Sequence, residues 1–157
     1  MRFAVAADHS GFAMKVPIIE RLRSWGHQVT DLGTFAPLPR IDFPDLAEKV
    51  CGELLSGRAD RGVMVCGSGI GACMAANKFP GIRAGVCHDI WSAHQSVEHD
   101  NANVLCLGAQ VVGEKVIYEL LKAFVDAQFT EEEYFRRRDA KLSALERRLI
   151  EEGARRG

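Results

Sequence analysis

A cysteine stands at the entrance of a glycine-rich turn near the middle of the chain. Cys66 ends an apolar run and is followed by the sequence GSGIG at positions 67–71. Backbone N–H groups of such a turn, at the start of a helix, can approach an anion and favour the thiolate form of a nearby cysteine. The pattern therefore predicts a Cys66 thiolate that acts as a nucleophile or as a proton acceptor.

The turn itself could stabilise negative charge on a reacting oxygen. Ser68 and the N–H groups of Gly67, Gly69 and Gly71 are suited to an oxyanion hole. A glycine turn can also be purely structural, or it can bind a nucleotide. The dinucleotide fingerprint belongs after the first strand, however, and a P-loop ends in Gly-Lys-Ser/Thr. This turn follows the third expected strand and lacks that ending, so it does not indicate a nucleotide site.

Two histidines lie beside acidic residues at the ends of expected elements. His9 follows Asp8 after the first strand, and His99 precedes Asp100 at the end of a helix. Each could serve as a general acid near neutral pH. For His88, after the fourth strand, a functional and a structural role are equally open.

The elements that must position these residues alternate along the chain. Strands are expected at 3–7, 28–32, 62–66, 82–87 and 104–107, and helices at 12–25, 45–55, 70–78, 91–98, 114–129 and 131–152. This alternation predicts an α/β fold, a parallel sheet with helices on both faces. Ligands of such sheets bind beyond the carboxyl ends of the strands. We expect the polar groups that follow the strands, His99 and Asp100 included, to gather at that edge.

Length and charge limit the classes of function. The chain has 157 residues, which suits one domain at positions 1–157. Its 20 basic and 21 acidic side chains give a net charge of −1. Because proteins that bind nucleic acid usually carry a clear basic excess, nucleic acid is not an expected partner.

The hydrophobic segments and the cysteines indicate a compartment. No apolar stretch approaches the roughly 20 residues that span a bilayer, and the first residues lack the features of a secretory signal. The five cysteines form no CxxC pair, so zinc-ribbon and thioredoxin spacings are absent from the sequence. We expect a cytoplasmic protein without membrane partner or metal, in which the cysteines other than Cys66 are small buried side chains.

The last expected helix, at about 131–152, mixes many charges with an apolar stripe. Leu142, Leu145 and Leu149 recur at helical spacing on one side of it. Such a stripe on a terminal helix often packs on another chain. We therefore expect this helix to contact a partner subunit.

Three segments resemble one enzyme family over nearly the whole chain. AADHSGF, VCGSGIGACMAANKFPGIRAGVC and HDNANVLCLGAQVVG are similar to the B-type ribose-5-phosphate isomerases and their galactose-6-phosphate isomerase relatives. The resemblance implies a Rossmann-like three-layer α/β/α sandwich with a five-stranded parallel sheet. It also implies an aldose–ketose isomerase of sugar phosphates that needs no cofactor. Such enzymes are homodimers or dimers of dimers, with active sites between subunits.

The resemblance also implies roles for individual residues. Cys66 matches the base that moves the proton, and Ala72 stands where another branch of the family has a glutamate base. His99 matches the acid that opens the sugar ring. The remaining positions match groups that hold the substrate: Asp8, His9, Gly67, Ser68, Gly69 and Gly71, with Arg138 as a phosphate-binding arginine.

Three positions depart from the ribose-5-phosphate enzymes that the sequence resembles. Asp100 stands where those enzymes have asparagine, and Gln110 stands where they have a phosphate-binding arginine. Tyr134 aligns roughly with a second arginine of those enzymes, which Arg136 or Arg137 could replace after a small shift. Arg40 in the Pro-rich loop could compensate for a lost phosphate-binding arginine. Losing an arginine matters because charge-assisted hydrogen bonds to phosphate are about twice as strong as neutral ones.

These departures affect the expected substrate more than the expected type of reaction. Ribose 5-phosphate, isomerised to ribulose 5-phosphate, is the first expectation. The alternatives are a four- or six-carbon sugar phosphate, an unphosphorylated sugar, or a sugar-phosphate-binding module without catalysis. Acyl or phosphoryl transfer by a cysteine nucleophile ranks last, because the sequence offers no second feature for it.

Overall fold

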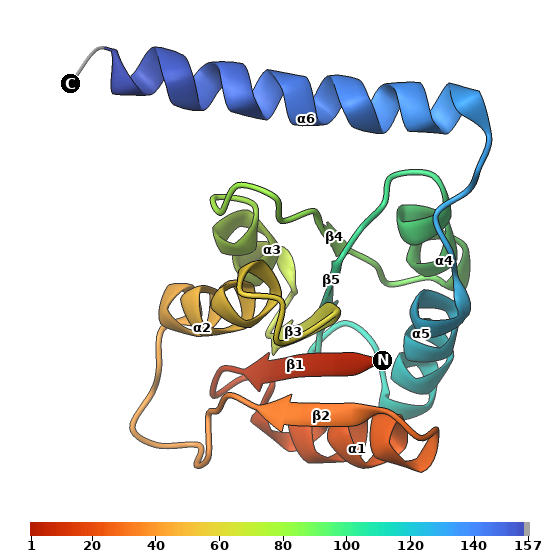
Figure 1. The fold of residues 1–157 in the computed structure, drawn as a ribbon. Helices are drawn as coiled ribbons and strands as arrows, with labels where there is room; N and C mark the ends of the chain where they lie inside the picture. The colour runs from red at the N-terminus through yellow and green to blue at the C-terminus, as the bar shows by residue number, and fades with distance from the viewer. Residues whose placement is uncertain (156–157) are drawn as a thin grey trace.

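A five-stranded sheet forms the centre of the computed structural model, which describes residues 1–155. The strands pair in the order β2-β1-β3-β5-β4, and every pairing is parallel (Figure 1). Their bounds are Arg2–Ala7 (β1), Gln28–Asp31 (β2), Arg61–Cys66 (β3), Ala84–Val86 (β4) and Val104–Gly108 (β5). The predicted five-stranded parallel sheet is confirmed.

Helices cover both faces of this sheet. Their bounds are Phe12–Ser24 (α1), Phe43–Leu55 (α2), Ile70–Ala76 (α3), Ile90–Glu98 (α4), Glu114–Asp126 (α5) and Glu133–Ala154 (α6). Successive strand residues point to opposite faces. Phe3 and Val5 pack with α1, α4 and α5, whereas Ala4 and Met64 pack with α2 and α3. These two hydrophobic layers make the predicted Rossmann-like α/β/α sandwich.

The bounds of the fourth strand and of the second helix differ from expectation. The fourth strand spans Ala84–Val86 and is shorter than 82–87, and side-chain amides bond the backbone where it begins. Asn77 bonds both the N–H and the C=O of Ala84 at 2.9 Å, and the Asn103 amide oxygen accepts the Arg83 N–H at 2.8 Å. The second helix begins at Phe43 rather than at 45, with Asp42 as its N-cap residue and Pro44 in its first turn.

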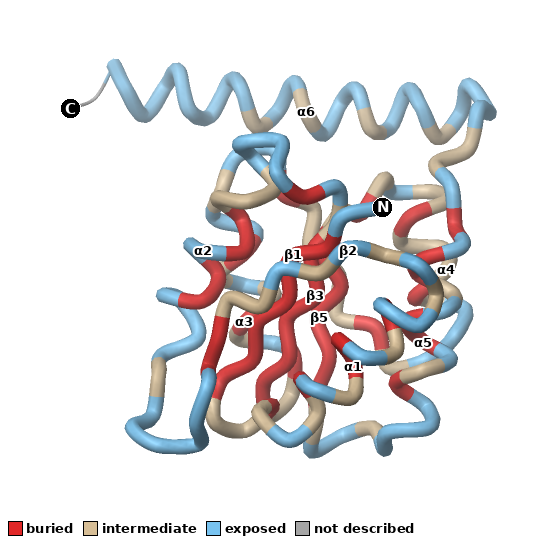
Figure 2. Tube along the Cα trace, turned by 60° about the horizontal axis from the view of Figure 1, so that its bottom comes forward, coloured by how far each residue is buried: buried red, intermediate tan, exposed pale blue. Residues whose placement is uncertain are grey.

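The last helix stands apart from the layers. Figure 1 shows α6 lying across one end of the molecule, and Figure 2 shows it exposed along its length, while the buried residues concentrate in the strands. No residue of Glu133–Ala154 is buried. Leu142, Leu145 and Leu149 are 42–56% exposed. The apolar stripe on α6 is therefore largely uncovered within a single chain.

Polar contacts hold α6 to the segment before β4. The Arg83 guanidinium lies 2.8 Å from the Asp139 carboxylate and donates to the Ser143 hydroxyl at 2.7 Å. The Gly81 N–H donates to the Glu146 carboxylate at 3.0 Å. These contacts orient the helix without burying its leucines. None of the helices within residues 1–155 is long and apolar enough to cross a bilayer.

Candidate functional site

The ends of β1, β3 and β5 bring three polar segments together. The Asp8 N–H donates to the Val65 carbonyl at 3.1 Å, so the turn after β1 lies against the end of β3. The Gln110 N–H donates to the Gly67 carbonyl at 3.0 Å, which joins the segment after β5 to the glycine turn. The carboxyl edge of the sheet thus gathers Asp8, His9, the glycine turn and Gln110, as predicted.

The Cys66 sulfur accepts a backbone hydrogen bond at the start of α3. The Gly69 N–H donates to Cys66 Sγ at 3.1 Å, and Gly69 adopts a left-handed conformation with φ of +81°. Cys66 is 6% exposed. A thiolate gains from an N–H donor at a helix N-terminus. The geometry that was predicted for Cys66 and its turn is therefore present.

The two residues that follow β1, Asp8 and His9, differ in their hydrogen bonds. One carboxylate oxygen of Asp8 accepts the N–H groups of Ser10 at 2.8 Å and Gly11 at 3.0 Å, so that oxygen orders the turn after β1. His9 Nδ1 is buried and has no hydrogen-bond partner among residues 1–155. A buried imidazole nitrogen without a partner is available to a ligand.

Close backbone approaches fix the shape of the glycine turn. A Cβ on Gly108 would lie 2.7 Å from the carbonyl carbon of Ser68, and a Cβ on Gly11 would lie 2.4 Å from the carbonyl oxygen of Val65. Neither contact can be relieved by moving a flexible side chain. The glycine turn and the end of β3 are therefore packed directly against the backbone of Gly108 and Gly11, which leaves no room for a side chain at either position.

Replacing Gly108 by alanine should lower the free energy of unfolding by about 1–3 kcal/mol, because the new methyl group overpacks against the Ser68 backbone. Urea denaturation at fixed protein concentration measures this change. Gly52→Ala is the matched control. Nothing lies within 4 Å of its added Cβ, and alanine in a helix interior is favoured over glycine by about 0.5–1 kcal/mol. Equal stability changes at both positions would contradict the tight packing of the turn.

His88, which the sequence left open, contributes to the scaffold of this edge. Its Nε2 accepts the Gly108 N–H at 3.1 Å. The bond occupies the nitrogen that would otherwise face a ligand as an acceptor. His88 therefore orders the end of β5.

His99 and Asp100 do not lie at this edge, and the expectation that they would was wrong. They follow α4, which begins after β4 and runs back along the sheet. The Asn103 carbonyl accepts the Gly62 N–H at 2.8 Å, near the start of β3, whereas Cys66 is the last residue of the same strand. A nine-residue helix is about 13.5 Å long. That length carries His99 to the amino edge of the sheet.

Arg138 lies with His99 rather than with Cys66. The His99 ring stacks on Phe135, three residues before Arg138 in α6. Arg137 pairs with Glu133 at 2.9 Å, and Arg136 pairs with Glu131. Arg138 has no carboxylate partner among the described residues and lies over the Tyr134 ring at 4.2 Å. Of these three arginines, it is the one whose charge is uncompensated by an ion pair.

Two groups of predicted site residues therefore exist on one chain. The cysteine group lies at the carboxyl edge and the histidine group lies at the amino edge. Arg40 belongs by position with the first, since the exposed loop between β2 and α2 extends beyond the arrowheads of β1 and β2 (Figure 1). The cysteine group contains Asp8, His9, Arg40, Cys66, Gly67, Ser68, Gly69, Gly71 and Gln110, and the histidine group contains His99, Asp100 and Arg138.

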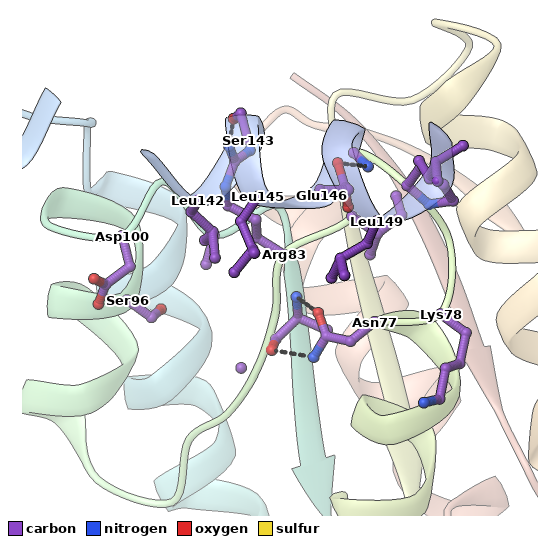
Figure 3. Close-up of a pocket in the computed structure, with 17 residues that line it drawn as sticks. Asn77, Lys78, Arg83, Ser96, Asp100, Leu142, Ser143, Leu145, Glu146 and Leu149 are labelled. Atoms are coloured by element: carbon purple, nitrogen blue, oxygen red, sulfur yellow. Dashed lines mark hydrogen bonds between the residues drawn. The ribbon is translucent and has the colours of Figure 1, made fainter. Parts of the chain in front are cut away.

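A cavity of about 720 Å³ lies elsewhere, between α6 and the segment around β4. Figure 3 shows Leu142, Leu145 and Leu149 pointing into it from α6, opposite Asn77. Its lining includes Asp100 but not Cys66. The cavity therefore touches the histidine group and is separate from the cysteine group.

One cysteine departs from the expectation of small buried side chains. Burial raises the pKa of Cys51 to about 11. Cys73 is only half-buried, and the neighbouring Cys106 thiol lowers its pKa to about 7 against the opposing effect of burial, with help from Val86 and Asn77. Nothing in the sequence indicated this lowered pKa, because Cys106 lies in β5 and Val86 in β4, far from Cys73 along the chain.

Comparison with known proteins decides the family. The sequence model described as Ribose/Galactose Isomerase matches residues 3–142. The chain belongs to the ribose/galactose isomerase family. It is 37% identical to ribose-5-phosphate isomerase B of Escherichia coli over 147 aligned residues. The alignment covers 94% of this chain and 97% of the relative.

Other members of the ribose/galactose isomerase family extend this comparison. The D-erythrulose-4-phosphate isomerase of Pectobacterium atrosepticum is 36% identical over 129 residues, with 82% of this chain and 85% of the relative covered. The solved ribose-5-phosphate isomerase B of Clostridium thermocellum superposes with a TM-score of 0.91 at 36% identity, covering 95% of this chain and 99% of that one. The fold is thus that of the family over nearly its full length.

Proposed function

We propose that this chain interconverts an aldose phosphate and a ketose phosphate, with ribose 5-phosphate and ribulose 5-phosphate as the first choice of substrate pair. The observation that carries the proposal is the Cys66 sulfur, which accepts the Gly69 N–H at 3.1 Å at the start of α3. The family and the E. coli relative, named for this reaction, support it. No cofactor or metal enters the proposed chemistry.

The proton transfer follows from the geometry of the cysteine group. The Cys66 thiolate removes the proton from C2 of the open-chain aldose. The electron pair of that bond forms the C1–C2 double bond of a cis-enediolate, and the carbonyl pair moves onto O1. A proton then passes from the O2 hydroxyl to O1, the thiol returns its proton to C1, and O2 becomes the carbonyl oxygen of the ketose. N–H groups of the turn and the Ser68 hydroxyl stabilise the negative enediolate oxygen.

Ring opening requires a general acid, and the family resemblance assigns that role to His99 rather than to His9 of the cysteine group. His99 is proposed for this step, and Arg138 and Asp100 for holding the sugar phosphate. Because these residues lie at the opposite edge of the sheet, a second copy of the chain must supply them. A two-fold dimer brings two different edges together twice, so a homodimer or a dimer of dimers would contain complete sites.

The uncovered stripe of α6 supports this assembly. Leu142, Leu145 and Leu149 are about half exposed, and burying such side chains against a partner stabilises a complex by roughly 25 cal/mol per Å² of apolar surface. We propose that α6, as expected from the sequence, packs on the partner subunit. The five free cysteines suit a reducing compartment, which supports the cytoplasm as the location.

A panel of sugar phosphates with four to six carbons tests the function. The purified protein, treated with EDTA, should isomerise at least one aldose phosphate and exchange its α-proton with deuterated water. A module that only binds sugar phosphate would retain the ligand but exchange no proton. Binding without exchange for every sugar of the panel would reject the isomerase. A covalent adduct on Cys66 in the mass spectrum would instead favour group transfer.

Replacing Gln110 by arginine should lower the KM for phosphorylated sugars by roughly fivefold to tenfold, because a charged donor binds phosphate more strongly than an amide does. Gln110 is adjacent to the glycine turn, where a Cβ on Gly67 would lie 3.1 Å from its Oε1. Gln110→Glu, of similar size, should raise the same KM. Steady-state kinetics on a phosphorylated sugar and its unphosphorylated counterpart measure both changes. Equal shifts for the two sugars would remove Gln110 from the phosphate site.

A further inference from the structure

Aromatic side chains hold the ring of His99 on two sides. The Phe135 ring stacks on the imidazole with 4.0 Å between centroids and 15° between planes. The Trp91 ring meets it edge-on at 6.5 Å and 83°. Stacked and edge-to-face contacts of this kind are the favoured aromatic geometries. The orientation of the imidazole is therefore set by residues of α4 and α6 together.

The backbone of His99 is fixed independently of its ring. Its N–H donates to the Gln95 carbonyl at 2.9 Å as α4 ends. Asn101 then turns the chain with φ of 54°, and its N–H donates to the Val97 carbonyl at 3.0 Å. Only the two side-chain torsions of His99 remain to be set, and the aromatic contacts set them.

A carboxylate also lies beside the ring. Glu98 Oε2 lies 3.6 Å from His99 Nε2 and 3.3 Å from His94 Nε2. The stacked imidazole therefore already lies within ion-pair distance of a carboxylate, and a charge on the ring would strengthen that contact. The Phe135 stack and the Glu98 carboxylate act on the ring in the same orientation.

The same aromatic row reaches the proposed phosphate arginine. Tyr134 meets Phe135 edge-on at 5.1 Å and 82°, and the Arg138 guanidinium lies over the Tyr134 ring at 4.2 Å. The row thus joins the proposed acid to the proposed phosphate-binding group. Two groups that act on opposite ends of one sugar phosphate must keep a constant separation.

We propose that Phe135 is a positioning residue that aims the His99 imidazole at the ring oxygen of a cyclic sugar phosphate. This inference rests on the proposed function. His99 must deliver a proton to the ring oxygen as the ring opens, and a misplacement of about 1 Å can cost about 100-fold in rate. The proton transfer between C1 and C2 takes place at Cys66 and does not use this ring. Phe135 therefore affects ring opening selectively.

Replacing Phe135 by leucine tests the proposal through two rates. The kcat for ribose 5-phosphate, whose furanose ring must open, should fall by roughly 10- to 100-fold. Deuterium exchange from solvent into C1 of ribulose 5-phosphate, which has no ring, should stay near the wild-type rate. Phe135→Tyr should restore the kcat, because the aromatic face is kept. Phe129→Leu, the same change outside this stack, should leave both rates unchanged.

Each outcome separates the inference from the proposed function. A wild-type protein that neither isomerises nor exchanges would reject the proposed function itself. An active wild type whose Phe135→Leu variant loses both rates equally would assign Phe135 a general structural role and overturn the inference. An unchanged kcat in that variant would overturn it as well. Only a selective loss of ring opening, rescued by tyrosine, supports it.

Discussion

Replacing Cys66 by alanine should reduce isomerisation by about 10²- to 10⁴-fold, the range that a general base contributes. The thiol is the proposed carrier of the proton, and alanine cannot take it up. Substrate binding should persist, because the groups proposed to hold the sugar phosphate lie in the turn, after β1 and, in the proposed dimer, on the partner subunit. Steady-state kinetics and a binding titration with ribose 5-phosphate measure the two effects.

Cys73 provides the matched control for this experiment. It is seven positions further along the chain, and its pKa of about 7 makes it the alternative thiol. Cys73→Ala should keep most of the activity, since Cys73 lies inside α3 beyond the glycine turn. If Cys66→Ala remained active and Cys73→Ala did not, the assignment of the base would move to the second thiol.

Mixing two inactive variants should restore activity if the site is shared between chains. Cys66→Ala lacks the proposed base and His99→Asn lacks the proposed acid. A dimer with one chain of each has one site with both groups intact and one site with neither. Because a two-fold dimer contains two equivalent sites, the purified mixed dimer should show about half the wild-type activity. Differently tagged chains, refolded together and purified on both tags, allow this measurement.

The control for complementation places both defects on one chain. A mixed dimer of Cys66→Ala with the double variant Cys66→Ala, His99→Asn contains no intact base and should remain inactive. The wild type mixed with the double variant contains no site with both groups if each site draws on both chains. Strong activity in that second mixture would place Cys66 and His99 of the same chain in one site, against the separation of the two groups.

Several features of the fold could be predicted because they depend on residues close together in the sequence. The GSGIG turn is an example, since Cys66, the donor Gly69 and the start of α3 lie within five residues. Left-handed glycine and strand-to-helix geometry are local properties of the backbone. The alternation of strand and helix likewise predicted the parallel sheet and its two helical layers.

Other features depend on residues that the folded chain brings together. The fourth strand is shorter than predicted, and where it begins the Asn103 side chain accepts the Arg83 N–H from twenty positions away. The role of His88 depends on the Gly108 N–H, twenty positions away. The lowered pKa of Cys73 depends on Cys106 in β5. No local pattern carries these contacts.

The sequence by itself determined the family of the chain and the place of the cysteine turn at the end of a buried strand. The tertiary structure decided that this turn and His99 lie at opposite edges of the sheet. The reason is the direction of the chain. Parallel strands run the same way, so the helix between two of them must return the chain from the carboxyl edge of the sheet to the amino edge. A residue after a strand therefore lies at the carboxyl edge, while a residue after the next helix lies at the amino edge.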